Sequence, residues 1–422
     1  MTMPQRPGTP RLLRAINDRA ALELLLERGP LTRPQLGAQT GLSKPTASQL
    51  LARLEARGLV HSVGEQEGGR GPNARLYAVK PSAAYVIGID VGPNRIEAAV
   101  ADITGEVAGH SDLATKGAAD PVAVVHQAVE RAAEHARIGL GQVSQIVIGT
   151  PGLVDPESGD IGFAWDLPSW HRGLLDALRS DLRRMVTLEN DVNLAGVAEQ
   201  HHGAGRDHDN FVLLWVGRGM GLATVLGGRL HRGTSGGAGE IGWLPVAGAD
   251  APTGDRRPGA LKGGFQALVG PEPVEDLARR YRLPADPADG PAAAAVAVRA
   301  AVEAGESGEG FLVELAQRLA LGVASVCLVV DPGLVVLAGE INRAGGSILA
   351  RRVEEAVSRI SPVRPRVVPS TVNGNPVLRG ALLTALDTAR QEIFTSTTEP
   401  VEPAVSTEPA EEPVAEPAES AT

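Results

Sequence analysis

Two short stretches carry the polar side chains best suited to hold a small ligand. The first, TLENDVNLAGVAE at 187–199, is expected to be a strand that delivers Asn190 and Asp191 just before a helix. An Asn–Asp pair at a strand end is suited to hydrogen-bonding sugar hydroxyls, and the Asp could serve as a general base. Asn and Asp are also good residues for the start of a helix, so a purely structural role as a helix cap stays open.

The second stretch, GEIGWLPVAGADAPTGDRRPGALKGGFQ at 239–266, looks like a ligand site that lacks some of its parts. It offers Glu240 and then Trp243, followed by a long loop of Gly, Pro, Ala and Arg with neither cysteine nor histidine. Two further strand ends, IGIDVGPNR at 87–95 and VIGTPGLVD at 147–155, add weaker signals. A working site, a site rebuilt for another ligand and a relic are the three interpretations.

These stretches lie in a region that predicts alternating strands and helices. Between 81 and 392, short apolar runs rich in β-formers are interleaved with longer Ala/Leu-rich helical runs, which favours α/β layers with hairpins at the sheet edges. Two strand-rich blocks, near 85–103 and 211–230, each begin with an apolar strand that ends in glycine. We therefore expect two similar lobes around a cleft.

The first 80 residues predict three helices and a hairpin. The first helix, at 11–29, has apolar positions that include Leu12, Ile16, Leu24 and Leu25. Two shorter helices follow, with Thr32 and Ser43 as their caps, a proline in each first turn, and glycine at each end. The third helix buries a face spaced i, i+3, i+4, i+7, made of Ala47, Leu50, Leu51 and Leu54.

The opposite face of the third helix is small, polar and basic at its start, as a helix in the DNA major groove must be. After it come two apolar strands joined by a Gly-rich tip, which predict a wing that reaches phosphates or a minor groove. The predicted DNA-binding residues are Thr32, Arg33, Ser43, Lys44, Thr46, Ser48, Gln49, Arg53, Arg70 and Arg75. A small protein-interaction domain with a solvated charged face is the alternative.

Charge is distributed unevenly along the 422 residues, whose formal net charge is −10. Residues 1–80 hold 12 Lys/Arg against 6 Asp/Glu, whereas residues 395–422 hold 7 Glu and no basic residue. A basic head on an acidic body indicates that only the head meets a polyanion. The tail of Pro, Glu, Ala, Thr and Ser predicts disorder, and we interpret it as a solubilising segment in preference to a specific interaction tail.

The rest of the composition excludes several classes of protein. The single cysteine, Cys327, lies in an apolar run and is expected to be a buried, inert thiol, so neither a disulfide framework nor a four-cysteine metal site is possible. The start, MTMPQRPGTP, has no apolar signal region, and no run approaches the ~18 apolar residues of a membrane span. We expect a soluble cytoplasmic protein without membrane partners.

Taken in order, the head and the four motifs of the body resemble the ROK family of repressors and sugar kinases over about residues 10–392. The most specific element is END at 189–191 combined with GRLHRGTSGGAGEIG at 228–242. The resemblance implies a winged helix-turn-helix followed by a two-lobed, actin-like ATPase fold. It implies five parts: the head at 1–80, lobes at 81–198 and 199–372, a C-terminal helix at 373–394 that returns to the first lobe, and the tail at 395–422.

The family's sugar-binding residues can be carried over only in part. Asn190, Asp191 and Glu240 match family residues that contact sugar hydroxyls, and Asp191 matches the catalytic base of the kinases. The family's zinc-binding histidine is Trp243 here, and its sugar-binding Glu after the cysteine-rich loop is Gln266. The resemblance therefore implies a ligand site made of Asn190, Asp191, Glu240, Trp243 and Gln266, with no metal.

The nucleotide motifs depart further from the family pattern. The phosphate turn reads DVGPNR, in which Pro93 removes an N–H, and the later glycine-rich hairpin carries Arg218 where a small residue is usual. Glu340 in LAGEIN brings an acid to the adenosine side. Because phosphoryl transfer relies on positioning and charge neutralisation, we expect neither ATP binding nor catalysis.

The leading hypothesis is a transcriptional regulator, most often a repressor in this family, that binds a palindromic double-stranded operator as a homodimer or homotetramer. A sugar-type effector in the cleft would change the geometry between the two heads. A sugar kinase with an appended DNA-binding domain and a regulator with a ligand-free scaffold body are the alternatives.

Overall fold

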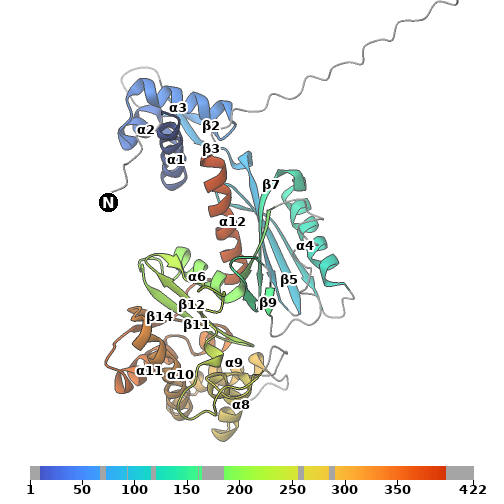
Figure 1. Cartoon of the computed structure of the whole chain (residues 1–422), viewed down its shortest axis with the longest axis vertical. Helices are drawn as coiled ribbons and strands as arrows, with labels where there is room; N and C mark the ends of the chain where they lie inside the picture. The colour runs from blue at the N-terminus through green and yellow to red at the C-terminus, as the bar shows by residue number, and fades with distance from the viewer. Residues whose placement is uncertain are drawn as a thin grey trace, which may run out of the picture. The chain divides into compact units, whose positions relative to one another are not determined.

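The structure is a computed structural model that describes residues 10–66, 73–92, 94–115, 120–159, 161–163, 185–254, 261–284 and 290–395. The chain forms two compact units, one made of Met1–Lys80 with Glu392–Thr422 and one of Pro81–Gln391. We call them the head and the body and describe each by itself. Figure 1 labels the elements of both.

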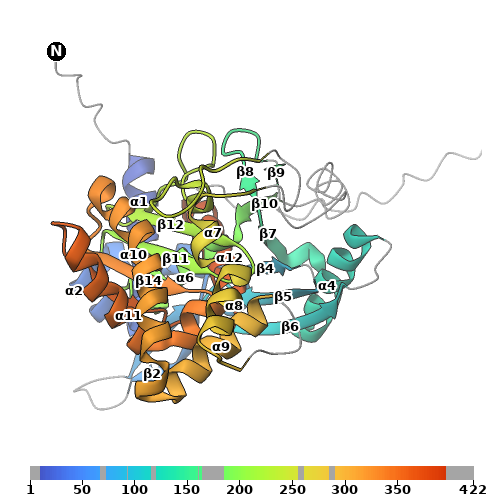
Figure 2. The ribbon, with the colours of Figure 1, turned by 90° about the horizontal axis from the view of Figure 1, so that it is seen from below.

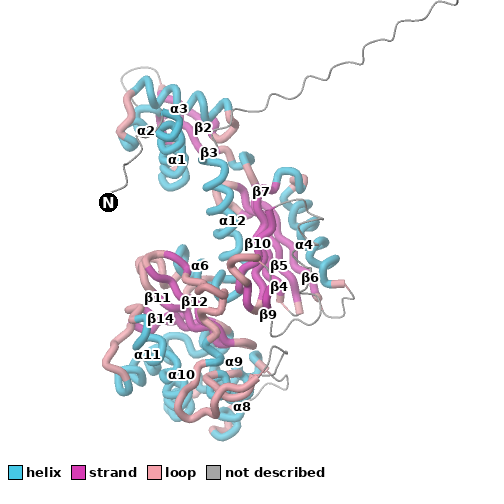
Figure 3. Tube along the Cα trace, viewed as in Figure 1, coloured by secondary structure: helices cyan, strands magenta, loops and turns pink. Residues whose placement is uncertain are grey.

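The head is a three-helix unit with a small antiparallel sheet (Figure 3). Its helices are α1 (Pro10–Arg28), α2 (Arg33–Thr40) and α3 (Lys44–Ala56). Its strands are β1 (Leu31–Thr32), β2 (Val60–Gln66) and β3 (Ala74–Val79), in the order β1-β3-β2. The β2–β3 hairpin is the predicted wing, and its tip at 67–72, with Arg70, lies outside the described residues.

Local sequence signals account for how α2 and α3 begin and end. Thr32 and Ser43 each accept a backbone N–H of the first turn, and Gln35 completes a capping box with Thr32. Gly41 ends α2 with φ of 72°, a left-handed conformation that glycine adopts without strain. The predicted inner face of α3 is confirmed, since Ala47, Leu50, Leu51 and Leu54 are all buried.

Helix α1 has the predicted extent to within one residue, but only some of its apolar positions are buried. Leu25 is buried and Leu24 partly so, whereas Leu12 and Ile16 are each 53% exposed. The N-terminal turns of α1 extend beyond the packed part of the head, and the buried positions begin further along the helix, at residues such as Ala21 and Leu22. Apolar periodicity shows which face a helix turns inward, but not how far its partners extend along it.

The first lobe of the body is built on a mixed sheet in the order β10-β7-β4-β5-β6. Its strands are β4 (Tyr85–Val91), β5 (Arg95–Asp102), β6 (Val107–Ala114), β7 (Val143–Thr150) and β10 (Met185–Asn190). Helix α4 (Pro121–Ala136) packs on β5 and β6, as Figure 2 shows, and a short pair, β8 (Leu153–Val154) and β9 (Ile161–Phe163), follows β7.

The second lobe repeats this arrangement in the order β13-β12-β11-β14-β15. Its strands are β11 (Phe211–Val216), β12 (Met220–Leu226), β13 (Arg229–Leu230), β14 (Leu334–Ala338) and β15 (Arg366–Pro369). Its helices are α6 (Asp191–His202), α7 (Gln266–Val269), α8 (Pro271–Arg280), α9 (Pro291–Glu303), α10 (Glu309–Val330) and α11 (Glu340–Ile360).

Both sheets pair three strands antiparallel and then add two in parallel, so each lobe repeats one topology. This confirms the prediction of two similar lobes. Helix α10 is long and apolar enough to cross a membrane by length and composition, but half of that apolar window is buried inside the body. Cys327 lies on this helix and is fully buried, so α10 is a core helix and the thiol a packing group.

Helix α12 (Pro376–Thr395) covers the face of the first sheet opposite to α4. It approaches so closely that a Cβ at Gly88 would lie 2.8 Å from the backbone nitrogen of Leu382. We predict that Gly88→Ala lowers the free energy of unfolding of the body by about 1–3 kcal/mol, because backbone cannot move aside as a side chain does.

Chemical denaturation of the full chain checks this prediction. Gly139→Ala is the matched control, since a Cβ there meets nothing within 4 Å and the glycine has an ordinary φ of −83°. Equal midpoints for the two variants would show that α12 does not pack on the sheet in this way.

Candidate functional site

The head collects most of its predicted DNA-binding residues on one surface. Ser43, Lys44, Thr46 and Gln49 lie along the first turns of α3, where Lys44 and Thr46 are exposed. Arg33, at the start of α2, donates from Nη1 to Oγ of Ser48 over 3.1 Å, and that hydroxyl donates to the carbonyl of Lys44. A compact polar and basic surface results, with small side chains that allow close approach to base edges.

Two predicted contacts have a structural role instead. Thr32 is buried and occupied as the cap of α2. Arg53 donates from Nε to Oδ2 of Asp18 over 3.0 Å, and Arg57 lies 3.6 Å from the same oxygen. Hydrogen bonding to the Asp18 carboxylate raises the pKa of Arg53, and Asp18 itself is buried. Arg75 lies on β3, while Arg70 is not described.

In the body, one cleft of about 960 Å³ is lined by residues from both lobes. All five residues of the predicted ligand site line it: Asn190, Asp191, Glu240, Trp243 and Gln266. They come from the end of β10, the start of α6, the short helical turn Ile241–Trp243 and the start of α7. The cleft is therefore built where the parallel strands end, the usual place for ligands in α/β folds.

The two interpretations of Asn190 are compatible. Its Oδ1 accepts the N–H of Asn193 over 3.0 Å as the cap of α6, and its Nδ2 donates to the carbonyl of Gly152. The amide is thus held rigidly at the cleft wall. Next to it, buried Glu189 accepts from Asn193 and from Nε of Arg232 at 2.6 Å, which ties the glycine-rich loop before Glu240 to β10.

Two carboxylates in the cleft are poised to change protonation near neutral pH. Burial raises the pKa of Asp191 to about 6, against the opposing effects of the N–H of Val192 and the charge of Arg218. Burial also raises the pKa of Asp90 to about 6, although Asp90 accepts a hydrogen bond from Nδ2 of Asn375 at 2.7 Å. The charge of Asp191 adds to the energetic cost of ionising Asp90, and the charge of Glu240 adds to the cost of ionising Asp191.

The raised pKa of Asp90 predicts that the stability of the protein depends on pH. Between about pH 4 and pH 6 the folded protein holds a proton on Asp90 that the unfolded chain has released, so this contribution stabilises at low pH and is lost as pH rises through 6. We expect Asp90→Asn to gain about 1–2 kcal/mol relative to wild type between pH 4 and pH 7. Urea denaturation of both proteins across this range measures it, and a constant difference would contradict it.

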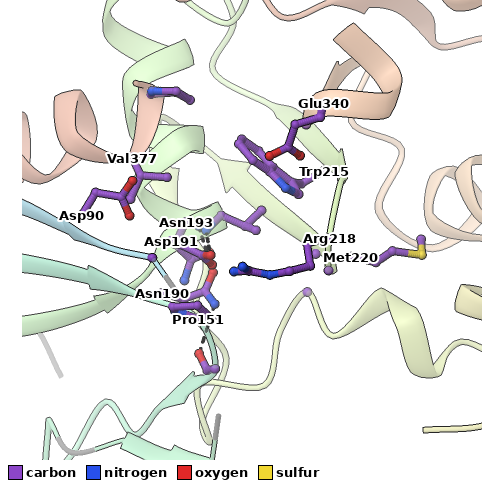
Figure 4. Close-up of a pocket in the computed structure, with 18 of the residues that line it drawn as sticks. Asp90, Pro151, Asn190, Asp191, Asn193, Trp215, Arg218, Met220, Glu340 and Val377 are labelled. Carbon is purple, nitrogen blue, oxygen red and sulfur yellow. Dashed lines mark hydrogen bonds between the residues drawn. The ribbon is translucent and has the colours of Figure 1, made fainter. Parts of the chain in front are cut away.

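The other end of the cleft carries the residues that depart from the nucleotide motifs. Figure 4 shows Arg218 pointing toward Asp191, with Glu340 beside Trp215. Glu340 is the first residue of α11, and its carboxylate covers Gly217, where an added Cβ would collide with Oε2. An acid therefore fills the space above the glycine-rich turn, where it would repel a phosphate.

Sequence reasoning did not place Asn375, Trp215 or Arg343 in this site, although all three line the cleft. Asn375 had a usable signal, because Asn before Pro376 is a common start of a helix, and its Oδ1 does accept two N–H groups of α12. Trp215 and Arg343 lie within a strand and a helix whose patterns give no sign of a ligand.

Buried Glu199 fixes the segment that leads to Asn375. Its carboxylate accepts from Oγ of Ser370 at 2.5 Å and from the backbone N–H groups of Thr371, Val372 and Ala204. Since Glu199 lies on α6 and the segment precedes α12, this carboxylate joins the two helices that begin at the cleft. Across the described residues, we find no group of three or more His, Cys, Asp or Glu side chains placed to hold a metal ion.

A winged helix-turn-helix head joined to a two-lobed body with a polar cleft defines a DNA-binding transcriptional regulator. The comparisons with known proteins agree, because the MarR family profile matches residues 16–71 and the ROK family profile matches residues 86–388. The chain therefore belongs to the ROK family, as its motifs indicated.

Relatives with known roles include regulators. The DNA-binding transcriptional dual regulator NagC of Escherichia coli K12 is 24% identical over 83% of this chain and 86% of its own length. The xylose repressor of Bacillus subtilis is 25% identical over 56% of this chain and 61% of its own.

Solved structures of the family share the fold. A ROK family transcriptional regulator, a homologue of the E. coli Mlc protein, superposes with a TM-score of 0.71 at 22% identity, over 91% of this chain and 99% of its own. A ROK hexokinase from Thermus thermophilus reaches 0.58 at 28% identity, over 73% of this chain and 99% of its own. The fold is therefore common to regulators and kinases, and both include the predicted two-lobed body.

Proposed function

We propose that this protein is a transcriptional repressor that binds a palindromic DNA operator through its head and a sugar or sugar derivative in the cleft of its body. A homodimer or homotetramer in the cytoplasm is the acting form, since a two-fold protein matches a two-fold operator. Two of its relatives are named for sugars, as the N-acetylglucosamine repressor and the xylose repressor, which supports the sugar class.

The observation that carries the proposal is the joining of two surfaces in one chain. The start of α3 offers Lys44, Thr46 and Gln49, and the cleft offers Asn190, Asp191 and Glu240. Carboxylates and a fixed amide are the partners that sugar hydroxyls require, and Trp243 adds an aromatic surface of the kind that sugar rings stack on.

A ligand changes DNA binding only if it binds better to one arrangement of the two heads than to the other. A tenfold change in operator affinity requires a difference of about 1.4 kcal/mol in ligand affinity between the two states. One or two hydrogen bonds made in one state and absent in the other are sufficient.

Mapping of the bound sites across the genome is the most direct experiment, because the neighbouring genes name the pathway and hence the ligand class. Thermal shift of the full chain against neutral sugars, amino sugars and sugar phosphates then tests the cleft. Stabilisation by one of these classes supports the proposal. No stabilisation by any compound favours the scaffold alternative, in which the body only joins the subunits.

Kinase activity is the second candidate function, and the kinase structures with the same fold are the reason to test it. We propose that phosphoryl transfer does not occur, because Glu340 fills the space above Gly217 and Arg218 turns back toward Asp191. Neither ATP nor zinc is part of the proposed function. Sugar-dependent ATP turnover that disappears in Asp191→Asn would establish the kinase instead.

The head makes a prediction of its own about DNA recognition. We expect Gln49→Ala and Ser48→Ala to relax sequence preference, whereas Arg33→Ala, Arg70→Ala and Arg75→Ala weaken binding to every sequence. Each lost phosphate contact should lower the slope of log affinity against log salt concentration by about 1. Fluorescence anisotropy with operator and random DNA measures both quantities. An unchanged affinity after removal of residues 1–80 would contradict DNA binding by the head.

A further inference from the structure

The DNA-facing part of the head carries an excess of positive charge. Residues 31–54, which include α2 and most of α3, hold three basic residues and no acidic residue, and the exposed Glu55 follows near the C-terminal end of α3. Arg33 and Lys44 are exposed there, while Arg53 is engaged by Asp18. This surface attracts any polyanion within reach, and DNA is only one of them.

A second polyanion belongs to the same chain and begins at the head. The last residues of α12 are part of the head unit, where the carbonyl of Ile393 accepts from Nη2 of Arg57 over 2.8 Å. Phe394 is only 2% exposed. Because Arg57 directly follows α3, the segment that begins at residue 396 leaves the described structure beside the C-terminal end of that helix.

The composition of residues 396–422 fits them to a basic surface better than to a core. They hold seven Glu, five Pro, no Lys or Arg and no aromatic residue. They lie outside the described residues, so their composition and their starting point are what connect them to the head. Their charge is close in size to the excess of six positive charges in residues 1–80.

We propose that residues 396–422 bind in cis to the basic surface of α2 and α3 and compete there with DNA. The reach is ample, since α3 is about 20 Å long and the residues up to Glu412 can extend to about 55 Å. The segment acts as a tethered electrostatic competitor that lowers the affinity for non-specific DNA and for the operator by the same factor, and the operator, with its added base contacts, keeps the higher affinity of the two. This inference rests on DNA binding by the head.

The expected size of the effect follows from the tether. A short linker gives an effective concentration in the millimolar range, so even a weak contact with a dissociation constant of about 0.1 mM lowers DNA affinity by about tenfold. Both attractions are electrostatic and weaken with salt, so the difference between proteins with and without the segment should vanish near ~0.5 M salt.

The experiment compares three proteins on random-sequence DNA and on the mapped operator. They are the natural chain, a chain that ends at Thr395, and a chain in which all seven Glu of 396–422 are replaced by Gln. At ~50 mM salt we expect the shortened and the Gln-substituted chains to bind random DNA about tenfold more tightly than the natural chain. Equal affinities of all three proteins would overturn the proposal and leave a solubilising role.

Two further results distinguish a contact in cis from a contact between molecules and from a failure of DNA binding by the head. In the natural chain without DNA, carbodiimide coupling should join glutamates of 396–422 to Lys44. The same coupling in a mixture of light and heavy isotope-labelled protein shows whether the two joined residues belong to one molecule, which supports the cis contact. Coupling only between molecules, or none, overturns it. If no protein binds DNA under any condition, DNA binding by the head has failed, which differs from equal but measurable affinities.

Discussion

An Asp18→Ala variant is expected to lose most of the stability of its winged head. Asp18 is the one buried acid of the described part of the head. It forms ion pairs with Arg53 on α3 and with Arg57, the residue that directly follows α3. Removal of one partner from a buried ion pair leaves the other charge uncompensated, at a cost of about 3–5 kcal/mol. A small domain has only about 5 kcal/mol to lose, so specific DNA binding should disappear as well.

Hydrogen exchange of the full chain, followed by mass spectrometry of peptides from residues 10–66, measures this effect without the head having to be isolated. Glu23→Ala is the matched control, because Glu23 forms an exposed pair with Arg19 on the same helix, and such pairs contribute at most about 1 kcal/mol. If the two variants exchange equally slowly, Asp18 does not hold the head together, and Arg53 becomes available as a DNA contact again.

The second large effect concerns the cleft. Asp191→Ala should abolish the thermal shift produced by whichever sugar class stabilises the natural protein, while operator binding without sugar stays unchanged. A carboxylate that accepts from sugar hydroxyls contributes about 1.5–3 kcal/mol, so the affinity should fall by about ten- to a hundredfold. Asn190 is not expected to compensate for this loss, because its amide already bonds to Asn193 and Gly152, whereas the Asp191 carboxylate accepts the N–H of Val192 on one oxygen.

Thermal shift and anisotropy on the same preparations check the result. Asp207→Ala provides the control, since Asp207 is an exposed carboxylate in the loop after α6. Asp191→Asn refines the experiment, because an amide keeps the shape and one acceptor and should retain part of the response. A sugar response that survives in Asp191→Ala would place the ligand elsewhere in the cleft or rule out Asp191 as its partner.

The elements that depend on neighbours in the sequence could be predicted well. The caps Thr32 and Ser43, the glycine that ends α2 and the buried face of α3 follow from hydrogen bonds and spacing within one or two helical turns. The motifs END and GEIG likewise point to Asn190, Asp191 and Glu240 through residue type and order alone, and all three line one cleft.

Contacts between distant parts of the chain could not be predicted, since nothing in a local pattern states what packs against it. Leu12 has the spacing of a core residue but is exposed, and Arg53 has the position of a DNA contact but meets Asp18. Asn375 is another example, because its role depends on Asp90, which is 285 residues earlier in the chain.

The motif GEIGW shows which properties of the site follow from the sequence and which follow from the tertiary structure. The sequence by itself determined that Glu240 and Trp243 are present and that cysteines are absent from the loop, which decides the kinds of ligand chemistry available, and its resemblance to the ROK family implied that Trp243 replaces a histidine. Only the tertiary structure decided that Arg218 faces Asp191, that Glu340 covers Gly217 and that burial raises the pKa of two aspartates to about 6. The physical reason is that residue type sets what a side chain can donate or accept, whereas burial and long-range packing set its partners and its charge.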